Sequence, residues 1–348
     1  YYTESIYNIP EQFKHEVDEL SNLDLSTDTN ELGNVLLTGA NGFIGVHVLY
    51  ELLYNTSSKI HCFVRGDNLN HSIERLDNNF NFYFGLSIKP FLGNRFEIYN
   101  GHIVEDNFKL SQKVVDFLAK DVNTIIHTAA IVKHYGNFEL FKKTNIDGTR
   151  RIAEFAFKNK KRLIHISSLS VSGNYLVKQN NKNVDFSEND LYIGQHYTKN
   201  VYVNSKYDAE KIIFSYMEHG LTAEILRVGI LSGRYLDGFF QKNISENAFY
   251  GRIKSLVDLH CVSKEMLDQK IEFTPVDLCA KSIVLLASSK KAENKVYHLY
   301  NHNLYTINEV LDVLKKFDVN IDVVSESDFE NKILNVSKDE TTNKSLKA

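Results

Sequence analysis

The stretch Thr38-Gly-Ala-Asn-Gly-Phe-Ile-Gly45 decides the fold class of this 348-residue chain. It follows a short apolar run, Asn34–Thr38, and it opens a segment from Phe43 to Tyr54 in which apolar residues recur with helical spacing. Glycines at 39, 42 and 45 allow a tight turn, a close backbone approach to a phosphate, and close packing of helix against strand. Because free N–H groups and the helix dipole attract an anion there, the stretch predicts a dinucleotide-binding turn rather than a plain loop.

Strand and helix patterns alternate along most of the chain. Further apolar runs of strand length occur at Lys59–Val64, Arg95–Tyr99, Asn123–His127 and Arg162–Ser167, and helix-length segments separate them. Alternation of this kind is typical of a parallel sheet with helices on both faces. We therefore expect an α/β fold with a doubly wound parallel sheet.

The alternation lapses from about Gly229 to Lys270, where the sequence is aromatic and charged and poor in strand patterns. We expect the parallel pattern to resume with a strand at Ile271–Asp277 and a helix to about Ser288. A strand at Val296–Tyr300 and a helix at Ile307–Lys316 should follow. The chain is thus expected to divide into an N-terminal helical extension or linker (1–32), a dinucleotide-binding domain (33–228, with 271–300 returning to it), and a smaller substrate-binding lobe (229–270 and 301–348).

Bulk composition excludes several classes of function. The chain is 43% hydrophobic and 24% charged with a net charge of -4, and it has no basic stripe or arm for nucleic acid. No apolar run reaches membrane-spanning length. Three cysteines (Cys62, Cys261 and Cys279) are far apart and lack metal-ligand spacing, so we expect no metal site and a reducing, cytoplasmic compartment. The first residue is tyrosine, which favours a monomeric domain of a larger polypeptide.

The second expected strand decides which dinucleotide binds. Sites for NAD commonly end this strand with an acidic residue that takes the ribose 2′-hydroxyl, about twenty residues after the glycines. Here Cys62-Phe-Val-Arg65 ends with arginine, whose guanidinium can hold a 2′-phosphate through charge-assisted hydrogen bonds. The alternative is a solvated surface arginine near Asp67. We expect NADPH rather than NADH.

A tyrosine and a lysine four residues apart, in Tyr202-Val-Asn-Ser-Lys206, open the next helical segment. Positions four apart share one helix face, so phenol and ammonium point into one cleft. The ammonium is expected to lower the pKa of the phenol and make it a competent acid near neutrality. Ser168, at the end of the fifth expected strand, is the candidate oxyanion donor; Ser167 and Ser170 compete with it.

The end of the fourth expected strand carries small side chains, Ala129 and Ala130, which would let a cofactor pass close to the backbone. Asn145 either orients the lysine through water or caps a turn. His127 and His134 are expected to be packed or hydrogen-bonded side chains rather than ligands.

Together these motifs resemble the extended short-chain dehydrogenase/reductase superfamily, whose dinucleotide domain has a Rossmann-type fold. Within it the chain is similar to the thioester reductase domains that end many nonribosomal peptide synthetases, and to the reductase domains of aminoadipate and carboxylic acid reductases. The resemblance runs from about Leu32 to Ser288 and more weakly to Val310. It is carried by Asn200–Glu210, Leu226–Gly229, Gly233–Gly238 and Phe273–Asp277.

The resemblance implies residue roles. Ser168 matches the family's catalytic serine or threonine, Tyr202 its acid and Lys206 its ribose-binding lysine. Gly101-His-Ile103 matches a family Gly-Asp-Leu whose acid approaches adenine, and here His102 replaces that acid. The full set of expected cofactor contacts is Gly39, Asn41, Gly42, Phe43, Ile44, Gly45, Arg65, Arg75, His102, Ile103, Ala129, Ala130, Asn145 and Val228, with Arg65 and Arg75 on the 2′-phosphate.

The implied function is NADPH-dependent release of an acyl or peptidyl thioester from the phosphopantetheine arm of an upstream carrier protein, as an aldehyde. The alternatives are a nucleotide-sugar epimerase or dehydratase, which usually prefers NAD, and a dinucleotide-sensing protein without catalysis, which typically lacks the Tyr-x-x-x-Lys pair. A membrane-associated fatty acyl reductase shares the chemistry, but no membrane anchor is evident in the sequence.

Overall fold

The computed structural model describes residues 6–16, 19–20, 23, 32–133, 136–173, 185–244 and 247–336. Its centre is a seven-stranded sheet in the order β11-β6-β5-β4-β1-β2-β3, in which every pair of neighbours is parallel. The strands are β1 (Val35–Thr38), β2 (Ile60–Phe63), β3 (Phe96–Tyr99), β4 (Thr124–His127), β5 (Arg162–Ser168), β6 (Ala223–Val228) and β11 (Val296–Leu299). The expected doubly wound α/β fold is confirmed.

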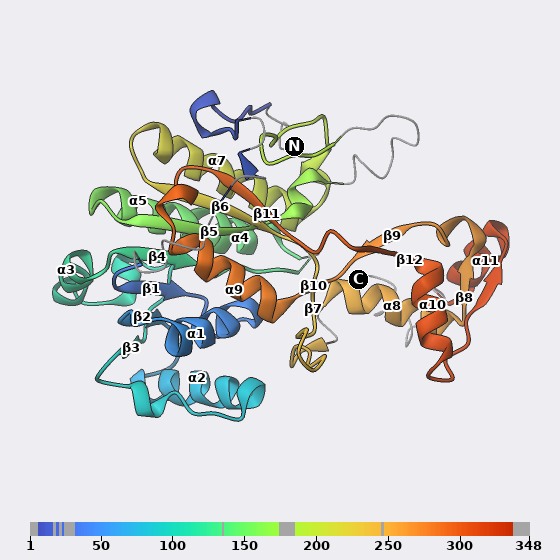
Figure 1. Ribbon diagram of the computed structural model, residues 1–348, viewed down its shortest axis with the longest axis horizontal. Coiled ribbons are helices and arrows are strands. Elements are labelled where there is room, and N and C mark those ends of the chain that lie inside the picture. The colour runs from blue at the N-terminus through green and yellow to red at the C-terminus, as the bar shows by residue number, and fades with distance from the viewer. Residues whose placement is uncertain are drawn as a thin grey trace.

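Helices cover both faces of this sheet (Figure 1). One face carries α1 (Phe43–Asn55), α2 (Leu69–Phe84) and α9 (Val276–Ala287), and the other carries α3 (Gln112–Asp121), α5 (Gly148–Lys158) and α7 (Val201–Glu218). Each face has its own cluster of buried apolar side chains. Strands covered on both faces must be apolar throughout, which is why every residue of β1, β2, β4, β5 and β6 is buried.

Shorter elements join this framework. The short helices are η1 (Glu11–Phe13), η3 (Lys89–Phe91), η4 (Asp106–Lys109), α4 (Phe138–Phe141), η5 (Lys142–Asp147), η6 (Leu169–Ser172), η7 (Tyr197–Lys199), η9 (Lys264–Met266) and η10 (Lys290–Ala292). Of these, η5 has π-helical geometry and runs directly into α5.

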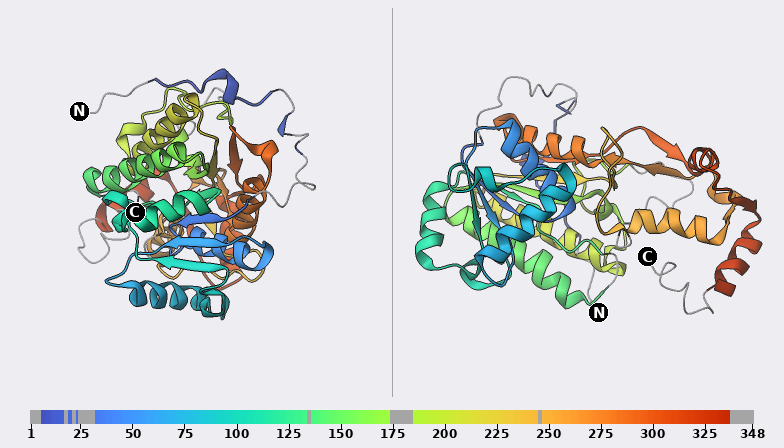
Figure 2. Two further views of the ribbon diagram at one scale, coloured as in Figure 1. Left: turned by 90° about the vertical axis from the view of Figure 1, so that its left-hand side faces the viewer. Right: turned by 90° about the horizontal axis from the view of Figure 1, so that it is seen from below.

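A second body, here named the C-terminal lobe, extends from the carboxyl end of the sheet (Figure 2). Its buried core joins side chains from two separate parts of the chain, including Leu256, Cys261, Ile307 and Phe329. The lobe consists of α8 (Ala248–Leu259), β8 (Cys261–Ser263), β9 (Lys270–Glu272), β12 (Leu304–Thr306), α10 (Ile307–Lys315), β13 (Asp322–Val324) and α11 (Glu326–Val336). Parallel pairing of β8 with β13 links the two parts.

The expected central strand at Ile271–Asp277 was wrong. Its first part lies in β9, which pairs antiparallel with β12. The rest forms β10 (Thr274–Pro275), which pairs with β7 (Leu231–Ser232) in a separate two-stranded sheet. Pro275 has no N–H to donate to a ladder, so it suits such a short pairing and not a central strand. This segment is where the chain crosses from the lobe back to the main sheet.

The N-terminal segment packs on the main body where it is described. Ile9 and Phe13 are buried in the core cluster beneath α7, and the rings of Tyr7 and Phe13 stack on Phe214 of that helix. Of the expected acidic amphipathic stretch Glu11–Leu25, only a three-residue turn at Glu11–Phe13 is helical within the described positions. Residues 17–18, 21–22 and 24–31 of that stretch and extension lie outside the described residues, as do His134 and residues 337–348.

Candidate active site

The glycine-rich turn joins β1 to α1. Gly39 has φ +78°, in the left-handed region that favours glycine. A Cβ on Gly39 would lie 2.6 Å from the backbone nitrogen of Ala129, and one on Gly45 would collide with the carbonyl oxygen of Gly39. Gly42 precedes α1, and no side chain in the described ranges caps this helix. The first N–H groups of α1 are therefore available to an anion, as a pyrophosphate site requires.

Two cations meet at the end of β2. Arg75, on α2, donates from Nη1 to the carbonyl oxygen of Arg65 at 2.9 Å. Partial burial and the Arg75 charge lower the pKa of Arg65, which reflects how close the two guanidinium groups lie. The carboxylate of Asp67 pairs with His71 at 3.0 Å rather than with Arg65. The two arginines thus form a cationic pair at the strand end where a ribose 2′-substituent is expected.

Three predicted residues line the same turn. With its amide oriented to donate to the carbonyl oxygen of Arg75 (3.3 Å), Asn41 accepts from Nε of Arg75 (3.2 Å) and so links the glycine turn to the arginine pair. Phe43 begins α1 and is half-buried, with its ring 5.6 Å from that of Phe240. Ile44 packs on the core beside it.

His102 and Ile103 follow β3 and differ in their surroundings. Desolvation and the Arg65 charge lower the pKa of His102, and its Nδ1 accepts from the backbone N–H of Val104 (3.3 Å). A neutral imidazole therefore lies close to Arg65, where an acid would have paired with it. Ile103 is buried and packs closely on Gly148 of α5, so its side chain serves the core.

The end of β4 is tied to the helices behind it. Ala129 and Ala130 follow the strand and are half-buried, and Gly39 packs on the Ala129 backbone. Asn145, in η5, accepts from the N–H of Ile131 (2.7 Å) and donates both to its carbonyl oxygen (2.9 Å) and to Ser205 Oγ (2.9 Å). Asn145 therefore positions the loop after β4 against α7, which is neither of the two roles we expected.

Ser168, Tyr202 and Lys206 converge at the carboxyl edge of the sheet. Asn200 caps α7 by accepting from the N–H groups of Tyr202 and Val203, so the helix begins immediately before the tyrosine. The Tyr202 hydroxyl is hydrogen-bonded to Ser168, the last residue of β5. Lys206 is buried and donates from Nζ to the carbonyl oxygen of Ile166 at 2.8 Å. Val228, at the end of β6, pairs with Ser168 across the sheet.

The protonation of this trio differs from our expectation. Burial raises the pKa of Tyr202, and the Ser168 hydrogen bond offsets only part of that rise. Burial lowers the pKa of Lys206 to about 8, although the Glu210 carboxylate opposes the shift. The expected lowering of the tyrosine pKa by the lysine was therefore wrong for this arrangement, because desolvation dominates and the ammonium hydrogen-bonds to a strand carbonyl.

A buried acid–base pair behind the trio was missed from the sequence. Glu210 is one helical turn beyond Lys206 and accepts from Ser167 Oγ, while Arg227 of β6 donates to both its carboxylate oxygens, from Nη2 at 2.8 Å. Arg227 also contacts His298 (3.2 Å) and lies over the Phe186 ring. Both residues occur in stretches that we quoted for the resemblance, but spacing alone does not pair a helix with a strand. Ser167 is thereby engaged away from Tyr202.

The histidines beneath the site are structural. His127 is buried between Thr38 Oγ1 (2.7 Å) and Thr149 Oγ1 (3.1 Å), and burial lowers its pKa to about 3. The prediction of a packed, hydrogen-bonded side chain is confirmed for His127. Among the described residues no group of three His, Cys, Asp or Glu side chains could hold a metal ion. Nor does any described helix have the length and apolar content to cross a membrane.

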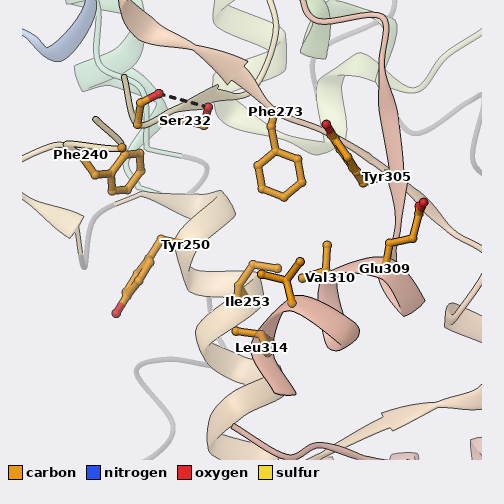
Figure 3. Close-up of a pocket in the computed structure, with 12 residues that line it drawn as sticks. Ser232, Phe240, Tyr250, Ile253, Phe273, Tyr305, Glu309, Val310 and Leu314 are labelled. Atoms are coloured by element: carbon orange, nitrogen blue, oxygen red, sulfur yellow. Dashed lines mark hydrogen bonds between the residues drawn. The ribbon is translucent and has the colours of Figure 1, made fainter. Parts of the chain in front are cut away.

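A cavity of about 450 Å³ lies between the end of β6 and the C-terminal lobe, lined almost entirely by apolar atoms (Figure 3). Its volume is in the range of small-molecule sites. Phe240, Tyr250, Phe273 and Tyr305 present their rings to it, and Ile253 lies at its base. None of these residues was singled out from the sequence, because aromatic residues in an irregular segment do not by themselves indicate a pocket.

An NAD-binding family described as "Male sterility protein" matches residues 37–283. The chain belongs to this family. A linear gramicidin synthase from Brevibacillus parabrevis has a polypeptide that is 26% identical over 294 residues, which cover 83% of this chain and 6% of that polypeptide. This chain thus spans only a small fraction of the length of that relative.

Solved structures give the same assignment. A thiolation-reductase di-domain from an archaeal non-ribosomal peptide synthetase is 31% identical, with TM-score 0.80 over 95% of this chain and 71% of that one. An aureusimine biosynthetic cluster reductase domain is 30% identical, with TM-score 0.75 over 93% and 81%. The chain is therefore an oxidoreductase of the extended short-chain dehydrogenase/reductase superfamily, with an NAD(P)-binding domain.

Proposed function

We propose that this chain is a terminal reductase domain that releases an acyl or peptidyl group from a carrier protein as a free aldehyde, with NADPH as hydride donor. The observation that carries the proposal is the contact of Ser168 with Tyr202 beside buried Lys206, at the sheet edge that also holds the glycine turn. The likeness to a thiolation-reductase di-domain supports a carrier-bound thioester as substrate.

The residues present fit a dinucleotide phosphate. The turn from Gly39 to Gly45 has no room for Cβ atoms and leaves the α1 N–H groups available, which suits a pyrophosphate. Arg65 and Arg75 lie together at the end of β2, and Asp67 neutralises neither. Two adjacent cations favour a ribose 2′-phosphate over a 2′-hydroxyl, which supports NADPH over NADH.

The proposed chemistry assigns one role to each member of the trio. Bound NADPH would supply a hydride to the thioester carbonyl carbon. Ser168 would donate a hydrogen bond to the carbonyl oxygen as charge develops on it, and Tyr202 would give that oxygen its proton. Lys206 would stabilise the phenolate that remains and hold the nicotinamide ribose.

Collapse of the resulting hemithioacetal completes the reaction. Its hydroxyl proton returns to Tyr202, the carbon–sulfur bond breaks, and the leaving thiolate takes a proton from water. One thioester, one NADPH and one proton thus give one aldehyde, one thiol and one NADP⁺. We propose further that residues 229–270 and 301–348 form the substrate lobe, that residues 33–228 and 271–300 bind the cofactor, and that an upstream carrier protein presents the thioester.

The test offers the purified chain NADPH with an acyl-pantetheine thioester and, separately, with a nucleotide-sugar. We expect loss of NADPH absorbance and an aldehyde, identified by mass spectrometry, from the thioester alone. Tyr202→Phe is the matched control: it should keep NADPH binding, measured by fluorescence titration, and lose most turnover because only the acid is removed. Turnover of the sugar, or absence of hydride transfer to every thioester, would overturn the proposal.

A further inference from the structure

We propose that the cavity at the end of β6 selects the acyl group, and that this chain takes uncharged acyl groups ending in an aromatic or branched aliphatic side chain. This inference rests on the proposed thioester reduction and specifies its substrate class. The cavity measures about 450 Å³, and apolar atoms make up nearly all of its lining. Placing an uncharged apolar group there releases water from both surfaces, whereas an ionised group would lose its hydration without gaining a partner.

The cavity is continuous with the candidate catalytic edge. Val228, the end of β6, pairs directly with Ser168, and Ser232 at the cavity wall comes four residues later. Four residues span at most roughly 14 Å, so the cavity begins within a short acyl chain's reach of the serine. On its other side, Phe240 meets the ring of Phe43 at the start of α1 at 5.6 Å. The cavity therefore lies between the trio, the phosphate turn and the lobe.

The shape of the lining favours flat or branched groups. The rings of Phe240, Tyr250, Phe273 and Tyr305 face the space from different elements, and Ile253 and Leu314 close its base (Figure 3). The Phe273 and Tyr305 rings contact edge to face, with their centroids 5.8 Å apart. Aromatic walls of this kind stabilise an inserted ring or branched chain through offset and edge contacts.

One carboxylate lies at this lining and determines which charges are rejected. Glu309 accepts from the N–H (2.7 Å) and Oγ1 (2.9 Å) of Thr306, forming a capping box that starts α10. These hydrogen bonds lower the pKa of Glu309, so it stays ionised at neutral pH. An acyl group with a terminal carboxylate would meet this negative charge as well as the cost of desolvation.

The experiment compares kcat/KM for four pantetheine thioesters: 3-phenylpropionyl, 4-methylpentanoyl, acetyl and glutaryl. We expect the first two to exceed acetyl by roughly 10- to 200-fold, the discrimination that apolar pockets achieve, and glutaryl to be the poorest. Equal kcat/KM for apolar and glutaryl thioesters would overturn this inference alone. Turnover of none of the four by the unmodified protein would instead contradict the proposed reductase function.

Two variants connect the preference to the cavity. Phe273→Ala should lower the ratio of 3-phenylpropionyl to acetyl kcat/KM at least several-fold, whereas Phe317→Ala, at an exposed ring of the same lobe outside the cavity, should leave it unchanged. Glu309→Gln retains a capping side chain and removes the charge, so the ratio of 4-methylpentanoyl to glutaryl should narrow. Ratios that move equally in the Phe317 variant, or in neither cavity variant, contradict the assignment.

Discussion

At the scale of single residues, the candidate site is governed by burial. Lys206 is enclosed by the ends of β5 and α7, and its Nζ hydrogen-bonds to the Ile166 carbonyl oxygen. Tyr202 is equally buried, and its pKa is raised. Charge at this edge is therefore costly until a substrate or cofactor group shares it, which ties the chemistry to the protonation of the lysine.

The first prediction concerns that lysine. Because burial lowers the pKa of Lys206 to about 8, it is charged below that pH and neutral above it, so kcat/KM for a thioester should fall as pH rises through about 8. Lys206→Arg keeps its charge across the working range and should move the fall to higher pH, even if its maximum rate is lower. Identical alkaline limits in the two pH–rate profiles would show that another group is responsible.

The second prediction concerns Arg65. Loss of a charge-assisted contact costs roughly 1.5–3 kcal/mol, so Arg65→Ala should weaken use of NADPH about ten- to a hundred-fold and leave use of NADH nearly unchanged. The apparent Michaelis constants for both cofactors provide the measurement. Arg151→Ala, at a surface arginine 3.8 Å from Asp106, is the matched control. An unmodified protein that uses both cofactors equally well would refute the NADPH assignment.

At the scale of elements, sequence patterns predicted what local order determines. The expected strand ranges contain β1 to β4, and β5 ends one residue beyond its expected range, because strands buried on both faces are continuous apolar runs. Ile271–Asp277 was assigned to the wrong sheet, since a short apolar run carries no information about which strand it pairs with. Tyr202 and Lys206 were found by spacing on one helix, whereas Glu210 with Arg227 required a helix and a strand to be brought together.

That helix–strand pair carries the third prediction. Glu210 and Arg227 are both fully buried, so Glu210→Gln would leave a cation without its charge partner, and stability should fall by roughly 3–5 kcal/mol. Urea unfolding measures the change. The double variant Glu210→Leu with Arg227→Met should recover most of the loss, because no buried charge remains. Glu154→Gln, which breaks a surface pair with Lys158, should have little effect. A double variant as unstable as the single one would contradict the argument.

At the scale of the whole molecule, several histidines are folded into the core in neutral form. Burial lowers the pKa of His47 to about 4 and the pKa values of His127 and His298 to about 3. In the unfolded chain these imidazoles bind protons near pH 6.5, and in the folded chain they do so only at lower pH. Stability contributed by their neutral packing is therefore present above pH 6.5 and is lost as pH falls below it.

The fourth prediction follows from that sign. The free energy of unfolding should decrease by up to about 1.4 kcal/mol per pH unit for each such histidine as pH drops from 6.5 toward 4. His47→Gln should reduce this slope by about one histidine's share, and His302→Gln, at an exposed position, should leave it unchanged. Denaturation at several pH values gives both slopes. Equal slopes in the two variants would rule out His47 as a contributor.

The crossings between the main sheet and the lobe have one more consequence. The chain passes this waist near residues 229–230, 273 and 300–301, and hydrogen bonds tie the passages together: Ile230 N–H to Glu272 (2.7 Å), Asn301 N–H to Thr274 Oγ1 (3.1 Å) and Asn301 Nδ2 to the Phe273 carbonyl oxygen (3.1 Å). A single protease cut in any one passage leaves two covalent connections. A nicked protein should therefore stay assembled and migrate as one particle under native conditions, and only denaturation should separate its fragments.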